Sequence, residues 1–222
     1  MFRYYKLASW KLEALAAVFS GLFTSKDSTS PIITSNYSEI PSELGFLSEL
    51  THLNLSTSVF SGRIPSRILK LSKLSSLDFS MNSHPYFGTN LLELERSVLV
   101  SLARNLTRLE KLHLSRVNIS SPLPKNLANL SSLPSFNVKG CRLSGELPTR
   151  MFQLPKLEYL NLRCNPFLVG HLPEFHSSSP LRALLLSCSS FFDKLPVSIG
   201  ELASLTKLDI NGCNLSCSLP YF

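Results

Sequence analysis

The 222-residue sequence carries none of the short motifs that bring catalytic groups together. It lacks G-x-S-x-G, G-x-x-x-x-G-K-S/T, H-E-x-x-H and C-x-x-C, which indicate a serine nucleophile, a phosphate-binding loop, and zinc or redox sites. His171 and His176 lie close in sequence, but Glu174 is the carboxylate between them and no cysteine is near, so we expect no metal site. We therefore predict a protein that binds other molecules, is not an enzyme and uses no cofactor.

The side chains best suited to binding gather in the middle of the chain. Cationic groups stand there beside an aromatic ring and an amide, a combination that suits the carboxylates of an acidic peptide or polyuronide. A face that is merely hydrated is the alternative interpretation. The candidate ligand-binding residues are Lys111, His113, Arg116, Lys139, Tyr159, Asn161 and Arg163.

The charge of the chain points to the same class of partner. A formal net charge of +7 favours acidic molecules. Nucleic acid is not expected, because the sequence has neither a long Lys/Arg run nor a basic stripe with interleaved aromatic residues.

A leucine repeat must position these residues. From Leu47 the sequence follows the pattern L-x-x-L-x-x-L-x-L-x-x-N-x-L-x-G-x-I-P through seven units. Units begin 24 residues apart, except that Leu71 and Leu106 are 35 apart, which gives the second unit 11 extra residues near 83–94. A period of this length is the signature of a leucine-rich repeat. We predict an α/β right-handed solenoid of about seven repeats with a parallel concave sheet.

The alternation within L-x-L predicts which side chains face solvent. The leucines of a short strand point into the core and the x residues point outward, where stacked strands arrange them in columns. The predicted central column is Asn54, Asp78, His113, Asn137, Asn161, Leu185 and Asp209.

The Asn position of the repeat has a predicted structural role. Its side-chain amide can satisfy buried backbone groups at the bend after the strand. Ser, Val or Cys often replaces it, so we expect Cys141 and Cys213, which fill this position, to be structural.

Sequons and cysteines are the candidate sites of modification. Cys164 and Cys188 are one repeat apart, so adjacent strands would bring them within disulfide range, although stacked free thiols are the favoured alternative. Cys213 and Cys217 are a second, weak pair. The Asn-x-Ser/Thr sequons favour secretion, and the candidate glycosylation sites are Asn36, Asn54, Asn105, Asn118, Asn129 and Asn214.

The L-x-G-x-I/L-P ending, seen best at residues 62–65 and 145–148, resembles the plant-type leucine-rich repeat. Residues 37–44 and the long second unit resemble receptor-like proteins of the disease-resistance type. The resemblance implies a ligand- or protein-binding ectodomain in defence or developmental signalling, on the extracellular side of the plasma membrane. It also implies an extracellular peptide, protein or acidic polysaccharide as ligand and a co-receptor kinase as partner.

The predicted organisation is an atypical N-terminal segment over residues 1–35 and a repeat array over 36–222. The first segment contains a remnant of a capping helix or a degenerate signal, and no stretch reaches the roughly 20 apolar residues of a membrane helix. The family's cysteine caps and membrane helix are not recognisable, so we expect a fragment of such a receptor. The alternatives are a secreted protein resembling polygalacturonase inhibitors, an intracellular leucine-rich scaffold and a non-functional receptor fragment.

Overall fold

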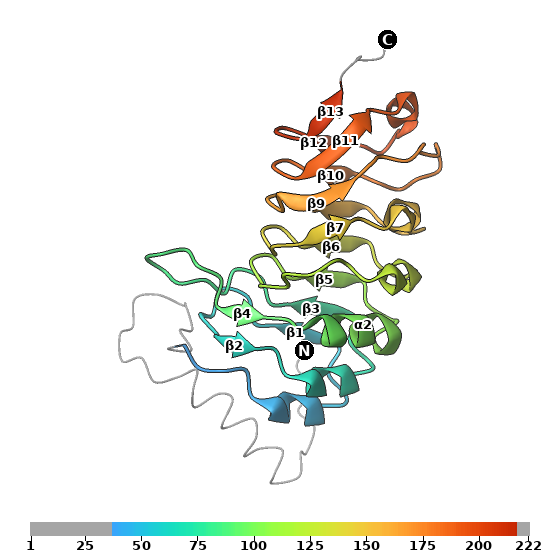
Figure 1. Ribbon diagram of the computed structural model, residues 1–222. Helices are drawn as coiled ribbons and strands as arrows, with labels where there is room; N and C mark the ends of the chain where they lie inside the picture. The colour runs from blue at the N-terminus through green and yellow to red at the C-terminus, as the bar shows by residue number, and fades with distance from the viewer. Residues whose placement is uncertain (1–36, 217–222) are drawn as a thin grey trace.

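The computed structural model describes residues 37–216 as an elongated stack of similar turns of chain (Figure 1). The predicted N-terminal segment over 1–35, Asn36 and Cys217 lie outside the described residues. Successive repeats rise in order from the N-terminal end of this stack to its C-terminal end. The predicted leucine-rich-repeat solenoid with a parallel sheet is confirmed.

A parallel sheet of seven strands, which we call the inner sheet, runs the length of residues 37–216. Each strand pairs in register with the strand of the next repeat, as Leu53 does with Leu77 and Leu77 with Leu112. The middle residue points into the core and its two neighbours point outward, because side chains alternate along a strand. The strands are β1 (His52–Asn54), β3 (Ser76–Asp78), β5 (Lys111–His113), β6 (Ser135–Asn137), β8 (Tyr159–Asn161), β10 (Ala183–Leu185) and β12 (Lys207–Asp209).

Shorter parallel sheets form where the G-x-I/L-P segment of each repeat runs extended. In the described chain one has four strands in the order β13-β11-β9-β7, and another pairs β2 with β4. Their strands are β2 (Gly62–Arg63), β4 (Leu92–Glu93), β7 (Ser144–Glu146), β9 (Phe167–Gly170), β11 (Ser190–Lys194) and β13 (Asn214–Ser216).

Short 3-10 turns line the side of the stack opposite the inner sheet. Each follows a proline, whose ring fixes φ near the value such a turn needs at its start. In the long second unit a full helix, α2 (Arg96–Asn105), takes the place of a 3-10 turn and buries Val98, Leu99, Leu102 and Ala103. The 3-10 turns are η1 (Ser42–Phe46), η2 (Ser66–Lys70), η3 (Lys125–Asn129), η4 (Thr149–Gln153) and η5 (Val197–Glu201).

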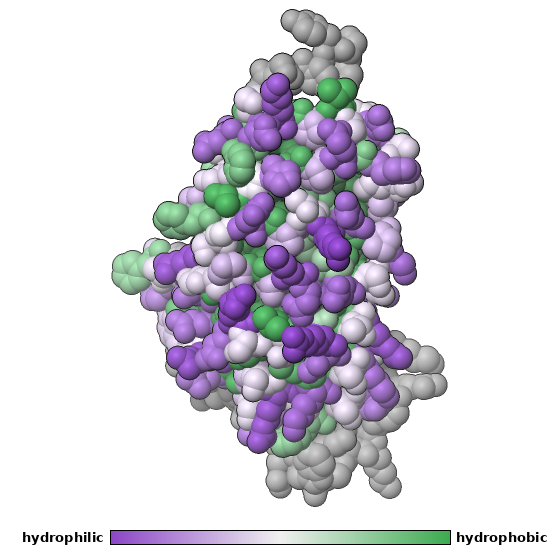
Figure 2. Space-filling model, turned by 45° about the vertical axis from the view of Figure 1, so that its right-hand side comes forward, coloured by the Kyte–Doolittle hydropathy of each residue, from purple (hydrophilic) through white to green (hydrophobic). Residues whose placement is uncertain are grey.

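The core is one continuous column of leucines with a few phenylalanines inserted. Leu77, Leu112 and Leu160 are fully buried, because a repeat on each side covers them. In the last inner strand the equivalent Leu208 is 41% exposed. Away from the core, the face drawn in Figure 2 is mainly hydrophilic, with apolar side chains dispersed among polar ones.

Buried asparagines connect neighbouring repeats, as the repeat pattern predicts. The Nδ2 of Asn165 donates hydrogen bonds to the carbonyls of Val138 and Leu162, at 2.9 and 2.8 Å. Its Oδ1 accepts from the backbone N–H groups of Cys141 and Leu143, at 3.0 and 3.1 Å. A single fully buried side chain thereby satisfies backbone groups in two repeats.

Cysteine performs part of this role where it replaces asparagine. The thiol of Cys141 donates to the Leu114 carbonyl at 2.9 Å, and that of Cys213 donates to the Leu186 carbonyl at 3.3 Å. Burial raises the pKa of the Cys141 thiol to about 12, which keeps it protonated and able to donate. These contacts match the structural role predicted for both residues.

Each repeat turns away from its inner strand at a residue with left-handed backbone, a position that we call the bend position. The φ angle there lies between 53° and 68° in every described repeat that has an inner strand. Glycine tolerates this conformation without strain, whereas other residues do so only where the surrounding structure imposes it. The bend positions are Thr57, Met81, Arg116, Gly140, Cys164, Cys188 and Gly212.

Candidate ligand-binding face

The outward residues of the inner sheet form columns across the repeats. Strand pairing aligns Asp78 with His113, His113 with Asn137, and Asn137 with Asn161. The neighbouring column aligns Lys111 with Ser135 and Ser135 with Tyr159. The predicted ligand-binding residues Lys111, His113 and Tyr159 therefore lie on one surface, which we call the inner face. Asn161 belongs to the same columns, but it is buried beneath its neighbours and only 2% exposed.

Asp78 organises the lower part of this face. Its Oδ2 lies 2.9 Å from Nζ of Lys111 and 3.5 Å from Nδ1 of His113. Its Oδ1 accepts from the backbone N–H of Ser80 at 3.0 Å. Burial alone would raise the pKa of Asp78, but the hydrogen bonds from His113, Lys111 and Ser80 outweigh it and lower that pKa below its usual range. Asp78 therefore stays ionised and holds the side chains of Lys111 and His113 in place.

The network continues toward the middle of the face through His113 and Tyr159. The Nε2 of His113 lies 2.7 Å from the Ser135 hydroxyl, and the rings of His113 and Tyr159 are 6.3 Å apart between centroids. The Tyr159 hydroxyl accepts from Nδ2 of Asn161 at 3.1 Å. These side chains are preoriented, so a ligand would not need to order them.

A second carboxylate, Asp209, organises the upper part of the inner face. Its Oδ2 accepts from the Ser187 hydroxyl at 2.8 Å and lies 3.3 Å from Nη1 of Arg163. The hydrogen bond from Ser187 is the main reason why the pKa of Asp209 lies below its ordinary value, and Arg163 contributes to the same shift. The Nε of Arg163 also donates to Oδ1 of Asn161 at 3.3 Å, which joins this group to the middle of the face.

Lys139 lies between these two groups. Its backbone N–H donates to Oδ1 of Asn137 at 3.3 Å, and its side chain forms no ion pair with any residue of the described range 37–216. The ammonium group of Lys139 is thus available for an anionic group, whereas Lys111 and Arg163 already share their charge with carboxylates of the protein.

Arg116 points away from the inner face, toward the extra residues of the second unit. Its Nη1 donates to the Gly88 carbonyl at 2.9 Å. On the other side of the same loop, Nδ2 of Asn90 donates to the Gly140 carbonyl at 3.0 Å. These two bonds attach the loop to the repeats that follow it.

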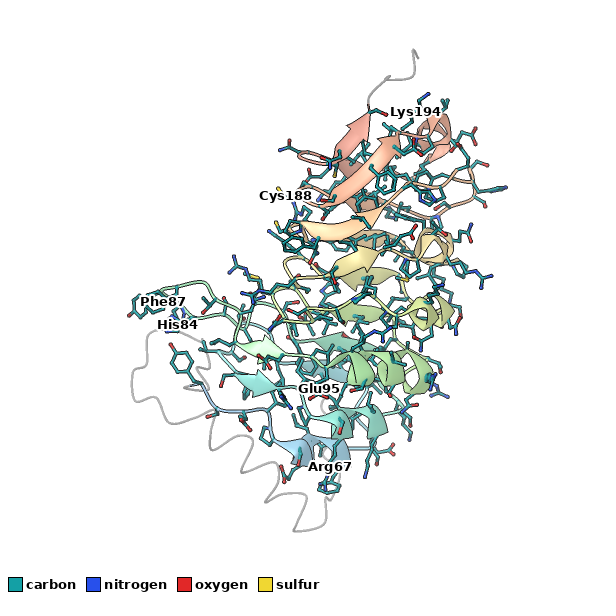
Figure 3. The ribbon with its side chains drawn as sticks, viewed as in Figure 1. Arg67, His84, Phe87, Glu95, Cys188 and Lys194 are labelled. Atoms are coloured by element: carbon teal, nitrogen blue, oxygen red, sulfur yellow. The ribbon has the colours of Figure 1, made fainter. Side chains whose placement is uncertain are left out.

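The loop itself, residues 83–90, is closed by a bridge between Ser83 and Asn90, and we call it the aromatic loop. The Nδ1 of His84 accepts from the backbone N–H groups of Tyr86 and Phe87, both at 3.3 Å. The ring of His84 packs against Phe87, with centroids 4.6 Å apart, and against Tyr37 at 5.5 Å. Figure 3 shows His84 and Phe87 at the end of the loop, away from the body of the stack. Tyr86 and Phe87 are 89% and 77% exposed.

Sequence reasoning missed the part that the carboxylates play. Asp78 and Asp209 were in the predicted columns, but neither was counted among the candidate binding residues. The signal was present, because strand register places Asp78 directly beside His113 and diagonally beside Lys111. The position of Arg116 one residue beyond the outward column also indicated that it would point elsewhere.

The predicted sequons are distributed unevenly around the described chain. Asn105, Asn129 and Asn214 are exposed and lie off the inner sheet, and Asn118 is half-buried. Asn54, on β1, is the one sequon on a described inner strand, at the N-terminal end of the face. The candidate binding residues from β5 onward therefore have no sequon among the outward positions of their strands.

Two other features, a membrane-spanning helix and a metal site, are absent from the described residues. In residues 37–216 no helix combines the length and the apolar character that crossing a membrane requires. The same residues contain no group of three or more His, Cys, Asp or Glu side chains arranged to hold a metal ion.

Comparison with known protein families and sequences gives consistent matches. The leucine-rich-repeat family model matches residues 156–178 and 204–222. Receptor-like protein 6 of Arabidopsis thaliana is 39% identical over 173 residues, which is 78% of this chain and 17% of that protein. Receptor-like protein Cf-9 of Solanum pimpinellifolium is 38% identical over 144 residues, 64% of this chain and 16% of that protein. The chain thus spans about one sixth of the length of these relatives, which are receptor-like proteins and not enzymes.

Solved structures resemble the fold over most of the chain. The ectodomain of the Arabidopsis thaliana receptor kinase GASSHO1/SCHENGEN3, in complex with CASPARIAN STRIP INTEGRITY FACTOR 2, gives a TM-score of 0.70 at 30% identity. That match covers 80% of this chain and 20% of the other. The Arabidopsis receptor kinase HAESA, in complex with the peptide hormone IDA and the co-receptor SERK1, gives 0.65 at 26% identity and covers 79% of this chain and 28% of that one.

Proposed function

Because the chain is a leucine-rich-repeat protein related to plant receptor-like proteins, we propose that it forms part of a ligand-binding receptor ectodomain. In this role it recognises a peptide or protein on the extracellular side of the plasma membrane, in defence or developmental signalling. The observation that carries the proposal is the inner face, a surface of mainly polar side chains that the strands hold in register, interrupted at β10 by the buried Ala183 and Leu185, with the unpaired cation of Lys139 near its centre.

The ligand that this face suits best is an acidic peptide. Lys139 supplies an ammonium group free for a carboxylate, and the networks around Asp78 and Asp209 fix donors on either side of it. Lys111 and Arg163 keep donor hydrogens beyond those used in their ion pairs, so each can bind a second oxygen. Tyr159 adds an aromatic surface between them. A ligand that binds across several repeats would therefore contact both charged and neutral hydrogen-bond donors.

A co-receptor kinase is the partner that fits this role. The described residues form a repeat array, and the HAESA structure shows an ectodomain of the same fold bound to both a peptide and a co-receptor. The aromatic loop, with Tyr86 and Phe87 exposed, offers a contact separate from the inner face. Large exposed aromatic side chains are enriched at protein interfaces.

Charge reversal at the centre of the inner face tests the proposal. The probes are a synthetic Glu/Asp-rich peptide and polygalacturonate, titrated against the full chain by calorimetry at low salt. Turning one attraction into a repulsion in water at about 4 Å changes the interaction by about 2 kcal/mol, so we expect Lys139→Glu to weaken peptide binding about 30-fold. Arg163→Glu should weaken it as well.

Lys125→Glu is the matched control, because Lys125 is an exposed cation on η3, across the stack from the inner face. We expect this variant to bind as the original chain does. Equal binding by Lys139→Glu and the original chain would remove the inner face as the ligand site. Preferential binding of polygalacturonate would replace the peptide with an acidic polysaccharide as the ligand class.

A further inference from the structure

Cys164 and Cys188 occupy the same bend position in two adjacent repeats. Both have a φ of 58°, so the two backbones present their side chains in the same direction. Both residues are exposed. Figure 3 shows Cys188 at the edge of the stack, where its repeat turns away from the inner sheet.

Strand pairing places these two residues directly beside one another. β8 pairs with β10 so that Asn161 aligns with Leu185, and the hydrogen-bond ladder continues to the N–H of Cys164, which donates to the Ser187 carbonyl at 2.9 Å. Neighbouring strands lie about 4.8 Å apart, and disulfides join Cα atoms about 4.4 to 6.8 Å apart. The two cysteines are thus within bridging range.

The next repeat gives a direct measure of how close side chains at this position come. A Cβ atom on Gly212, the following bend residue, would lie 3.8 Å from Sγ of Cys188. Side chains at successive bend positions are therefore close enough for van der Waals contact, and we expect rotation about the Cα–Cβ bonds to bring the two sulfurs together.

The other described cysteines have different surroundings. The thiol of Cys141 is buried and donates to a backbone carbonyl, and the thiol of Cys213 is half-buried and does the same. Among residues 37–216, Cys164 and Cys188 are the cysteines that face solvent. Exposure is what a small-molecule oxidant requires to reach a thiol.

We propose that Cys164 and Cys188 form a reactive dithiol that a small-molecule disulfide converts into a covalent bond between adjacent repeats. The thiolate of one cysteine attacks a sulfur of oxidised glutathione, which forms a mixed disulfide and releases one glutathione thiolate. The second cysteine thiolate then attacks the protein sulfur of that mixed disulfide and releases the other glutathione. The protein loses two hydrogens, and both protons end on the released glutathione thiols.

The bond would fasten together two repeats of the inner face. Cys164 follows Arg163 in the chain, and Cys188 follows Ser187, the two residues that bind Asp209. Oxidation would therefore fix the spacing of the strands that carry these side chains. The inference depends on the geometry of the bend position and is independent of the proposed function.

Peptide mapping of the oxidised full chain tests the proposal. The chain is incubated with oxidised glutathione, alkylated with iodoacetamide and digested with trypsin without reduction. Cleavage after Arg163 and Arg182 puts the two cysteines on separate peptides, residues 164–182 and 183–194. We expect one linked species of these two peptides, two hydrogens lighter than their sum, and loss of two of the five titratable thiols. Reduced glutathione should reverse both changes.

Serine variants identify the sulfurs involved. Cys164→Ser and Cys188→Ser should each abolish the linked species, whereas Cys213→Ser should retain it. The proposal is overturned if iodoacetamide still alkylates Cys164 and Cys188 after the oxidation step. It is also overturned if either cysteine is linked instead to another cysteine of the chain, or if oxidation yields only disulfide-linked dimers.

Discussion

Replacing Asn165 with alanine should weaken the fold more than any surface substitution. The change removes the hydrogen-bond partners of four buried backbone groups. The Leu162 carbonyl keeps another partner, because it also accepts from the Ser189 hydroxyl at 2.9 Å. The N–H groups of Cys141 and Leu143 and the Val138 carbonyl are left without one. At about 1 kcal/mol or more for each unsatisfied buried group, the free energy of unfolding should fall by about 3 to 5 kcal/mol.

Cysteine at the same position should have a smaller effect. A thiol there can donate to the Val138 carbonyl, as Cys141 donates to the Leu114 carbonyl one repeat earlier. Two N–H groups then remain unsatisfied, so we expect Asn165→Cys to lower the free energy of unfolding by about 2 kcal/mol. The predicted order of stability is therefore Asn, then Cys, then Ala.

Urea unfolding followed by circular dichroism measures this order. Asn129→Ala is the matched control, because Asn129 is exposed on η3, and its effect should stay within about 0.5 kcal/mol. The variants should be made in bacteria, so that a glycan at Asn129 does not enter the comparison. A loss below about 1 kcal/mol for Asn165→Ala would refute the view that the side-chain amide holds the two repeats together.

Three further predictions concern the inner face and the aromatic loop. The pKa of Asp78 is lowered in the folded chain, so its ionisation contributes stability above about pH 4 that is lost as the pH falls. Asp78→Asn should therefore lower the free energy of unfolding by about 1 to 2 kcal/mol at pH 7. Urea titrations should also show a smaller change in that free energy between pH 7 and pH 3 than in the original chain. An unchanged pH dependence would contradict this. Arg116→Ala removes the bond to the Gly88 carbonyl, so amide hydrogen exchange over residues 84–90 should speed up while the melting temperature changes by no more than about 2 °C. Phe87→Ser should change the free energy of unfolding by less than about 0.5 kcal/mol, since the side chain is 77% exposed, and a larger loss in thermal melts would show that the ring packs into the fold.

The leucine period was sufficient to predict the architecture, for a physical reason. A single repeat cannot bury Leu112 or Leu160 by itself, so the pattern has meaning only if successive repeats stack in register. The alternation on each strand then predicts the outward columns. The same logic predicted that Asn165 and Cys141 would satisfy backbone groups at the bend.

The leucine repeat pattern could not predict the hydrogen bonds and ion pairs on the inner face. Arg163 and Asp209 are 46 residues apart and lie two strands away from each other, so only the length of the arginine side chain brings them together. The path of the aromatic loop depends on local contacts, such as those of His84, that no repeat predicts. The repeat period determines where the backbone atoms lie. Side-chain pairing on the surface also depends on the length of each side chain and on which other partners compete for it.

The left-handed backbone at the bend position disfavours some side chains on the edge of the solenoid. Because φ is positive there in each repeat, a side chain branched at Cβ is strained. Thr57, in the first repeat, is the branched exception, and Met81, Arg116, Cys164 and Cys188 are unbranched at that atom. None of these residues belongs to the leucine core, so one long or reactive group can be exchanged for another without disturbing the packing of the stack. The residues at the bend positions can therefore differ in chemistry from one repeat to the next, while the leucine core that stabilises the fold stays the same.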